Sequence, residues 1–208
     1  MRKSEVMNQI RKNKVVAVIR GNSLEEGYNI SAACIKGGII SIEVAYTNLN
    51  AGAIITKLTE DYPDAFIGAG TVLDPETARN ALLAGAKYIV SPAFNADTAK
   101  ICNRYGVPYL PGCMTITEII TAMESGCEMI KLFPGSTFGT KYISSIKSPL
   151  PQASIMVTGG VSLTNAKDWL DAGCDAIGIG GEFNKLGAQG KFDEITKMAN
   201  DYIAIVGK

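Results

Sequence analysis

The segment MIKLFPG at residues 129–135 is a short apolar run that a lysine interrupts and that ends on proline and glycine. Seven further runs resemble it, rich in β-branched residues and apolar on both faces: 15–20, 38–46, 65–72, 87–92, 107–112, 154–160 and 176–181. Strands of a parallel sheet have this composition because helices cover the sheet. The chain therefore contains eight candidate strands of one parallel sheet.

Segments with a helical pattern separate these runs. Each begins at a residue whose side chain can accept hydrogen bonds from the first N–H groups of a helix, and each closes on glycine. The expected capping residues are Ser23, Asp74, Asn95 or Asp97, Thr115, and Ser162 or Thr164. Eight strand–helix units in 208 residues predict a (β/α)8 TIM barrel of the α/β class.

A weak internal repeat supports this fold, because a glycine precedes a strand at four corresponding places. These glycines are Gly38, Gly85, Gly126 and Gly173. An open doubly wound sheet is the competing fold, but the chain lacks the glycine fingerprint of dinucleotide-binding sheets.

Residues 1–13 look like an extra N-terminal helix ahead of the first strand. Val6, Met7 and Ile10 fit one face of it, and we expect that face to close the bottom of the barrel. No linker or low-complexity segment divides the chain, so residues 1–208 are expected to form a single (β/α)8 barrel domain.

The charge balance limits the partners of the protein. Lys+Arg and Asp+Glu both number 20, and no basic run occurs, which argues against a nucleic-acid partner. No apolar run approaches the ~18 residues of a membrane span, and the N-terminus lacks the apolar stretch of a secretory signal. Five cysteines without close pairing fit a reducing compartment. We expect a cytoplasmic protein with no membrane partner.

Histidine is absent from the sequence. This absence argues against histidine general bases, Ser–His triads and histidine-ligated zinc. A group that transfers protons must then be sought among the other side chains.

Two opposite charges are expected inside the barrel. Side chains alternate along a strand, so Lys131 lies on the face opposite to Ile130 and Leu132. The branched pair suits the layer between sheet and helices, which turns Lys131 inward. The same alternation turns Glu43 of the second strand inward, so that both charges point into one core.

This pair has two interpretations. It is a buried salt bridge, although the desolvation cost of such a pair often cancels its Coulomb attraction. Alternatively, apolar surroundings keep the Lys131 amine uncharged, the form that attacks a carbonyl to give a Schiff base, while Glu43 moves the protons. Both residues lie toward the C-terminal ends of their strands, where barrel active sites are built.

Other strand ends add polar groups. Arg20 ends the first strand, Thr71 follows GAG at the end of the third, and Pro92 ends the fourth. A guanidinium and a hydroxyl beside glycine amides would suit a carboxylate ligand. The last two strands end in TGG and GIGG, which place Gly159, Gly160, Gly180 and Gly181 where many barrels bind phosphate through backbone N–H groups.

With these residues the chain resembles the class I aldolase family of 2-keto-3-deoxy-6-phosphogluconate and 2-keto-4-hydroxyglutarate aldolases. The resemblance runs from AVIRGNS near residue 17 to GIGGEF near residue 183. Its landmarks, in order, are IEV at Glu43, GAGTV at Thr71, VSP at Pro92, PG at 111–112, KLFPG at Lys131, TGG at 158–160 and GIGG at 178–181.

The resemblance implies a homotrimeric barrel aldolase with no metal and no organic cofactor. Lys131 would form the Schiff base and Glu43 would be the acid–base group, working through a bound water. Thr71 and neighbouring amides would hold the pyruvate carboxylate, and Phe133 and Pro92 would shape the pocket. The implied reaction is reversible cleavage of the 2-keto acid 2-keto-3-deoxy-6-phosphogluconate to pyruvate and glyceraldehyde 3-phosphate.

The chain also departs from the family pattern. Many members carry arginine four residues after the catalytic glutamate, where this chain has Thr47, and Arg20 is a candidate replacement cation. A serine often follows the GIGG-like loop, where Gly181 and Glu182 stand here. These changes leave open aldolases for 2-dehydro-3-deoxy-6-phosphogalactonate, or for 4-hydroxy-2-oxoglutarate, which would give pyruvate and glyoxylate.

Other functions compete with an aldolase. A phosphate-binding barrel of epimerase or thiamine-phosphate synthase type would leave Lys131 and Glu43 without a joint purpose, and so would a catalytically idle barrel that serves as an assembly subunit. Trp169, Tyr142 and Cys113 are interpreted as packing residues.

Overall fold

The computed structural model describes residues 3–207 and contains an eight-stranded parallel sheet. The strands are β1 (Val15–Ile19), β2 (Ser41–Ala45), β3 (Phe66–Gly70), β4 (Ile89–Val90), β5 (Tyr109–Leu110), β6 (Ile130–Leu132), β7 (Ile155–Thr158) and β8 (Ala176–Ile179). Their order in the sheet is β5-β4-β3-β2-β1-β8-β7-β6. Sequence neighbours are therefore spatial neighbours throughout this order.

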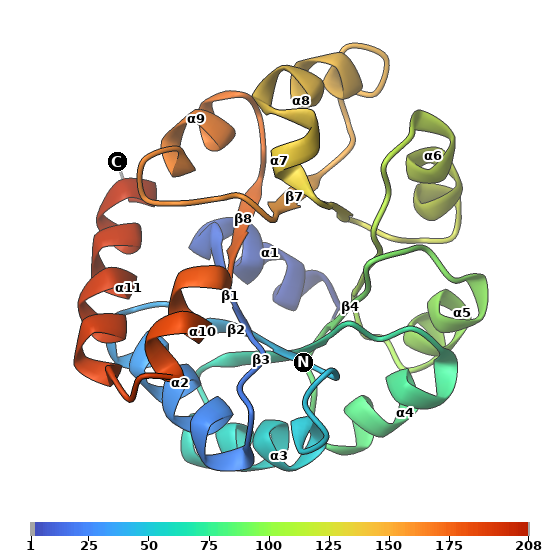
Figure 1. Ribbon diagram of the computed structural model, residues 1–208. Helices are drawn as coiled ribbons and strands as arrows, with labels where there is room; N and C mark the ends of the chain where they lie inside the picture. The colour runs from blue at the N-terminus through green and yellow to red at the C-terminus, as the bar shows by residue number, and fades with distance from the viewer. Residues whose placement is uncertain (1–2, 208) are drawn as a thin grey trace.

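The strands at the two ends of this order, β5 and β6, also meet and close the sheet. Gly112, just beyond β5, forms a parallel bridge with Lys131 of β6. The Lys131 N–H donates to the Pro111 carbonyl at 2.8 Å, and the Cys113 N–H donates to the Lys131 carbonyl at 2.9 Å. The predicted (β/α)8 barrel is confirmed, with the strands inside a ring of helices (Figure 1).

The barrel has helices between its strands and after the last one, which form its outer layer, and one helix ahead of the first strand (Figure 1). They are α1 (Lys3–Asn13), α2 (Leu24–Lys36), α3 (Ala51–Asp61), α4 (Pro75–Leu83), α5 (Ala96–Arg104), α6 (Ile116–Glu124), α7 (Gly135–Phe138), α8 (Thr140–Lys147), α9 (Ala166–Asp171), α10 (Gly181–Gly187) and α11 (Phe192–Val206). None of the helices in residues 3–207 combines the length and the apolar character that a membrane span requires.

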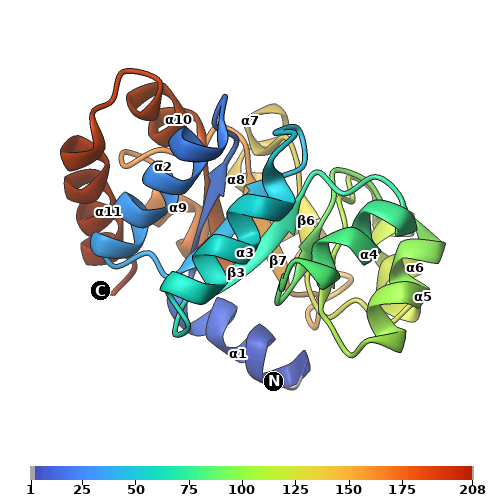
Figure 2. The same cartoon turned by 90° about the horizontal axis from the view of Figure 1, so that it is seen from below.

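The first helix, α1, covers the end of the barrel at which the strands begin. Figure 2 shows it beneath the strands, apart from the outer ring. Val6, Met7 and Ile10 are buried and belong to one apolar cluster with inward residues such as Val16 and Met156. The prediction that this helix closes the bottom of the barrel is confirmed.

Most of the predicted capping residues begin their helices. Ser23 accepts from the Glu26 N–H, Asp74 from the Thr77 N–H, and Asn95, rather than Asp97, from the Thr98 N–H. Thr115 and Glu118 form a reciprocal capping box at the start of α6. Gly85, Gly106, Gly126 and Gly173 follow helix ends with positive φ, a conformation that glycine adopts without a steric penalty.

One capping prediction is wrong. The helix expected to begin at Ser162 or Thr164 is α9, which begins at Ala166 after Asn165. The Asn165 side chain accepts from the Ser162 N–H at 2.9 Å and donates to the Gly160 carbonyl at 2.9 Å. These two bonds hold residues 160–165 in a turn, so the helix begins only after it.

The helices that directly follow β6 and β8, α7, α8 and α10, are not predicted by the sequence pattern, whereas the charged C-terminal segment reads as the amphipathic last helix that α11 is. Segments α7 and α8 follow the strand that carries Lys131, and α10 begins directly at Gly181. Each begins beside glycine and lacks a side-chain cap, so the usual start signal is missing. These helices follow strand ends where we place candidate ligand groups.

Candidate active site

Lys131 and Glu43 meet inside the barrel, as strand alternation predicts. Lys131 is the middle residue of β6 and Glu43 the middle residue of β2. Lys131 Nζ lies 3.4 Å from Glu43 Oε1, and the two residues are 6% and 0% exposed. The contact is therefore an ion pair or a proton-sharing pair that is almost completely removed from solvent.

Glycine on β3 provides the space for the carboxylate. Gly70 follows Gly68 on the inward face of β3, and in the strand pairing Gly68 is opposite Glu43 and Gly70 opposite Ala45 of β2. A Cβ atom at Gly70 would overlap Glu43 Oε1 and lie 2.5 Å from Glu43 Cγ. The glutamate side chain thus lies directly over the glycine backbone, which fixes the direction of its carboxylate.

The surroundings of the lysine amine are mostly apolar. The Phe133 ring centroid is 5.4 Å from Lys131 Nζ. Met156, on the neighbouring strand β7, pairs with Lys131 and is fully buried. Glu43 Oε2 is enclosed and has no hydrogen-bond partner among the described residues. The carboxylate therefore keeps one oxygen available for another donor.

A cavity of about 220 Å³ opens above this pair at the C-terminal ends of the strands. It is lined by Val18, Arg20, Glu43, Thr47, Thr71, Pro92, Lys131, Phe133, Thr158, Gly159, Gly178, Gly180 and Gly181. All residues that the sequence singled out for a site lie around it except Gly160. The structure thus brings together candidates from seven strand ends, and their roles stay predictions.

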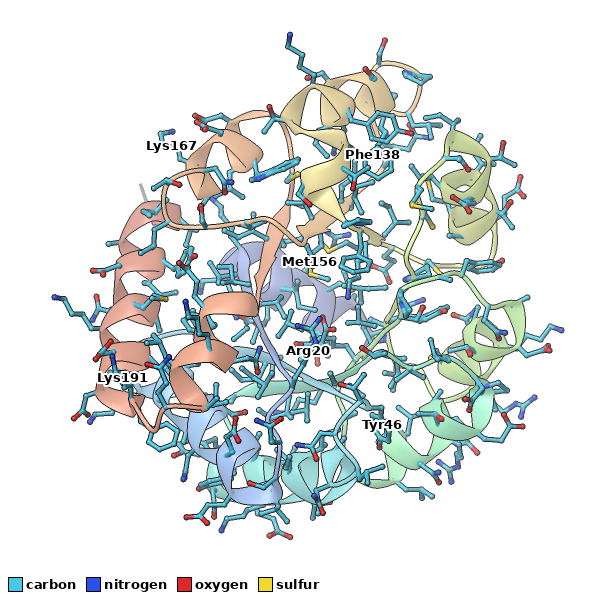
Figure 3. All side chains as sticks on the ribbon, in the orientation of Figure 1. Arg20, Tyr46, Phe138, Met156, Lys167 and Lys191 are labelled. Carbon is cyan, nitrogen blue, oxygen red and sulfur yellow. The ribbon has the colours of Figure 1, made fainter. Side chains whose placement is uncertain are left out.

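Arg20 is held at the mouth of the cavity by two asparagines. Its backbone N–H donates to Asn184 Oδ1 at 2.7 Å, and its carbonyl accepts from Asn48 Nδ2 at 2.9 Å. Its guanidinium has no hydrogen-bond or ion-pair partner within residues 3–207, and it projects over the middle of the strand ring (Figure 3). This leaves the charge available to a ligand.

Thr71 adopts a backbone conformation that a β-branched residue rarely takes. Its φ is 54°, in the left-handed region, directly after β3. Such conformations cost about 1–3 kcal/mol and concentrate at binding and catalytic sites. The turn directs Thr71 to the cavity wall.

The two glycine loops differ in what they offer the cavity. Gly159, Gly180 and Gly181 line it, and Gly181 has open space where a side chain would stand. Gly160 does not line it, because its backbone packs against Ser136 at the start of α7, where a Cβ atom would lie 2.6 Å from the serine Cβ. Three of the four glycines predicted to bind phosphate therefore line the cavity.

Comparison with known proteins decides the family. The family model for KDPG and KHG aldolase matches residues 6–198. The chain belongs to the KDPG and KHG aldolase family. It is accordingly an enzyme of the carbon–carbon lyase class, and the epimerase, thiamine-phosphate synthase and scaffold interpretations are set aside.

Individual relatives align with most of this chain. The 2-dehydro-3-deoxy-6-phosphogalactonate aldolase of Escherichia coli (strain K12) is 34% identical over 175 residues, 83% of this chain and 85% of that protein. The 2-dehydro-3-deoxy-phosphogluconate aldolase of Treponema pallidum (strain Nichols) is 32% identical over 206 residues, 97% of this chain and 98% of that protein. A solved structure described as native KDPGal is 31% identical with a TM-score of 0.85, covering 93% of this chain and 94% of that chain.

In this aldolase Glu182 turns away from the cavity. Its Oε2 accepts from the Tyr202 hydroxyl at 3.1 Å, on α11. Burial, together with the nearby Glu182 charge, raises the pKa of Tyr202 above its ordinary value, so the hydroxyl stays a donor. The carboxylate that stands where relatives often carry serine is therefore occupied elsewhere.

Thr158 is a site residue that the sequence analysis missed. It is buried at the end of β7, lines the cavity, and its hydroxyl has no partner among the described residues. Its signal was present: it occupies the inward position two residues after Met156 and precedes the glycine pair of TGG. Asn48 and Asn184, which hold Arg20, had no comparable signal.

The residues interpreted as packing take that role. Trp169 is buried in the outer core, and Tyr142 stacks on Phe138 with ring centroids 4.8 Å apart. Cys113 is buried and lies outside the cavity, and burial raises the pKa of its thiol to about 12. A thiol with such a pKa carries almost no thiolate at neutral pH and is a poor nucleophile.

Proposed function

We propose that this aldolase is a class I enzyme in which Lys131 forms a Schiff base, and that it reversibly cleaves 2-keto-3-deoxy-6-phosphogluconate to pyruvate and glyceraldehyde 3-phosphate. The observation that carries the proposal is the 3.4 Å contact between Lys131 Nζ and Glu43 Oε1 in the enclosed barrel. An ion pair in this place would add little stability because desolvation offsets its attraction. An amine beside a carboxylate is what imine chemistry requires.

The first half of the reaction forms the Schiff base. The Lys131 ammonium gives its proton to the Glu43 carboxylate across their contact. The neutral amine attacks the C2 carbonyl carbon of the keto acid. Glu43 then protonates the departing hydroxyl, water leaves, and the iminium remains on Lys131.

The second half breaks the carbon–carbon bond. The Glu43 carboxylate takes the C4 hydroxyl proton through a bound water. The C3–C4 electron pair moves toward the iminium, which gives an enamine and releases C4 as the aldehyde carbon of glyceraldehyde 3-phosphate. Glu43 returns a proton to C3, and hydrolysis frees pyruvate and Lys131.

The cavity wall supplies the contacts for the pyruvate portion. The Thr71 hydroxyl and neighbouring amides would bind the carboxylate, and Pro92 and Phe133 would hold the flat iminium between them. The unpartnered Thr158 hydroxyl is available to a substrate hydroxyl. The Arg20 guanidinium at the mouth is available to a second anionic group.

The phosphate is assigned to the opposite wall. The backbone N–H groups around Gly159, Gly180 and Gly181 would bind it, and the Glu182 carboxylate points away from it to Tyr202. Thr47 leaves the position of the expected arginine neutral. Arg20 is then the candidate counter-charge.

Borohydride trapping with pyruvate tests the Schiff base. We expect a reduced pyruvyl adduct on Lys131, located by peptide mass mapping, and no adduct in the Lys131→Met variant. Lys87 provides the matched control, because burial lowers its pKa although it lies outside the cavity. An adduct on Lys87, or none at all, would overturn the proposal.

A second substrate is favoured by specific observations. The relative with 34% identity and the solved structure with 31% identity both carry the galactonate name, and Thr47 departs from the arginine pattern. We therefore propose 2-dehydro-3-deoxy-6-phosphogalactonate as the alternative substrate. Comparing kcat/KM for the two phosphorylated epimers and for 4-hydroxy-2-oxoglutarate decides between them, and equal values with and without phosphate would remove the glycine-loop phosphate site.

The assembly is proposed from the family resemblance. A homotrimer in the cytoplasm, without a metal or organic cofactor, is expected. Light scattering should give three times the chain mass of 22.0 kDa, and dialysis against a chelator should leave activity unchanged.

A further inference from the structure

A buried tyrosine lies in the same row of the barrel as the acid–base carboxylate. Glu43 of β2 pairs with Gly68 of β3. On the other side of β3, the Ala69 N–H donates to the Tyr88 carbonyl at 3.0 Å, so Tyr88 follows Gly68 in the same row. The residue between the glutamate and the tyrosine therefore has no side chain.

The tyrosine ring extends across this glycine toward β2. A Cβ atom at Gly68 would lie 2.5 Å from both Cε2 and Cζ of Tyr88, the far end of the ring. The far end of the ring, which carries the hydroxyl, therefore lies over the residue that pairs with Glu43. Gly68 admits the tyrosine ring in the way that Gly70 admits the Glu43 side chain.

Both polar groups are buried, and each has an unused hydrogen-bonding atom. The Tyr88 hydroxyl and Glu43 Oε2 are enclosed and have no partner among residues 3–207. An unpaired buried hydroxyl costs about 1–3 kcal/mol, and phenylalanine would fill the same space without that cost. A hydroxyl retained here therefore points to a task other than packing.

The electrostatics of the pair agree with this arrangement. Burial, with a further contribution from the Glu43 charge, raises the pKa of Tyr88 well above its ordinary value. The hydroxyl is consequently protonated at any pH at which the enzyme works. It is a donor without an acceptor, in a core where one oxygen of Glu43 lacks a donor.

We propose that Tyr88 is a positioning residue for Glu43, whose Oε2 accepts a hydrogen bond from an enclosed water molecule that in turn accepts one from the tyrosine hydroxyl. This bond orients the carboxylate so that Oε1 faces Lys131, and it stabilises the anion that receives protons. The inference rests on the proposed function, because that function makes Glu43 the proton carrier. Tyr88 itself touches no substrate.

The test separates imine formation from proton transfer. With pyruvate alone, the enamine on Lys131 takes up deuterium from D2O at the methyl carbon, which proton NMR follows directly. For Tyr88→Phe we expect exchange to slow by about tenfold or more, while borohydride trapping still locates the complete pyruvyl adduct on Lys131 after long incubation. Tyr46→Phe is the matched control, since its hydroxyl is also enclosed and unpartnered but lies near Gly52 of α3.

The pH profile gives a second readout. The titratable groups facing Glu43 are Lys131 of β6 and Tyr88, which directly precedes β4, and Arg20 just beyond β1 lies at the mouth of the same cavity. Losing a donor to the carboxylate should move the acid limb of the exchange rate to higher pH. In the Glu43→Gln background, Tyr88→Phe should have no further effect on exchange, because it acts through the carboxylate.

The outcomes are distinct for the two proposals. If the wild-type protein forms no pyruvyl adduct and catalyses no deuterium exchange, the proposed function fails, and the role of Tyr88 fails with it. If the wild type exchanges and Tyr88→Phe exchanges at the same rate with a higher Tm, the tyrosine is a packing residue and this inference alone is overturned.

Discussion

At the scale of single residues, the chemistry depends on two charges held in one apolar interior. Lys131 and Glu43 are 88 residues apart in the chain, and their side chains meet at 3.4 Å. Neither is near another ion-pair partner within the described residues. The proton that one releases therefore has a single nearby acceptor among these residues.

The Glu43→Gln variant tests that exchange of protons. We expect the Lys131 adduct to be trapped still, while kcat falls by about 10²-fold or more, because glutamine neither accepts nor returns a proton. Steady-state kinetics and mass mapping on the same preparation measure both. Unchanged turnover would remove Glu43 from the acid–base role.

A matched carboxylate serves as the control for this variant. Glu182 directly follows Gly181, which lines the cavity, but its side chain accepts a hydrogen bond from Tyr202 instead. Glu182→Gln should therefore leave kcat/KM for the phosphorylated substrate within about twofold of the wild type. A large rise would show that the carboxylate reaches the phosphate.

At the scale of elements, β3 makes room for the site. Its inward positions are Phe66, Gly68 and Gly70, so two of the three have no side chain. The spaces that they leave are filled from the neighbouring strands, by Tyr88 on one side and Glu43 on the other. The strand contributes its backbone and lets its neighbours' side chains cross it.

Substituting Gly70 by alanine tests the role of this strand. The new methyl group would overlap the Glu43 carboxylate, so we expect both a lower Tm and a loss of kcat of at least tenfold. Thermal unfolding and steady-state kinetics measure the two effects. Retained activity would mean that the carboxylate has freedom to move aside.

Gly52 on α3 gives the comparison. A Cβ atom there would lie 3.6 Å from the nearest atom, an ordinary contact. Gly52→Ala should raise stability by about 0.5 kcal/mol through helix propensity and leave kinetics unchanged. The added methyl group meets an ordinary contact on the helix and the Glu43 carboxylate on the strand.

At the scale of the whole molecule, the closed barrel and its helices leave no cysteine accessible. Cys34, Cys102, Cys113, Cys127 and Cys174 are all free and buried. Burial raises the pKa of Cys102, Cys127 and Cys174 to about 12, as it does for Cys113. The thiolate fraction at pH 8 is therefore about 10⁻⁴ in these four groups.

This burial makes the thiols reporters of unfolding. With a disulfide reagent at pH 8, we expect no fast reaction in the native protein and five equivalents in guanidinium chloride. The slow reaction of the native protein should depend on how fast, or how often, the protein unfolds, and not on access of the reagent to one thiol of the folded protein. One rapidly reacting thiol in the native protein would contradict the described burial.

Local patterns account for much of the fold and part of the site. Alternation along 38–46 and 129–135 correctly turned Glu43 and Lys131 inward, and the capping residues at Ser23, Asp74 and Thr115 began their helices. These features depend on neighbours a few residues away, which the sequence displays. The start of α9 was missed because Asn165 bonds back to Ser162 and Gly160 rather than capping a helix.

The sequence alone determined which residues face the interior, that a lysine and a glutamate stand there, and that the family is an aldolase family. Only the tertiary structure decided which of these residues touch: the 3.4 Å Lys131–Glu43 contact, the crossing of Gly68 by Tyr88, and the separation of Gly160 from the cavity. The reason is physical. Backbone geometry within one strand sets the side of the sheet to which a side chain points. Which side chains touch depends on the register between strands and on the space that glycines leave, and the register and this space arise only when the barrel closes.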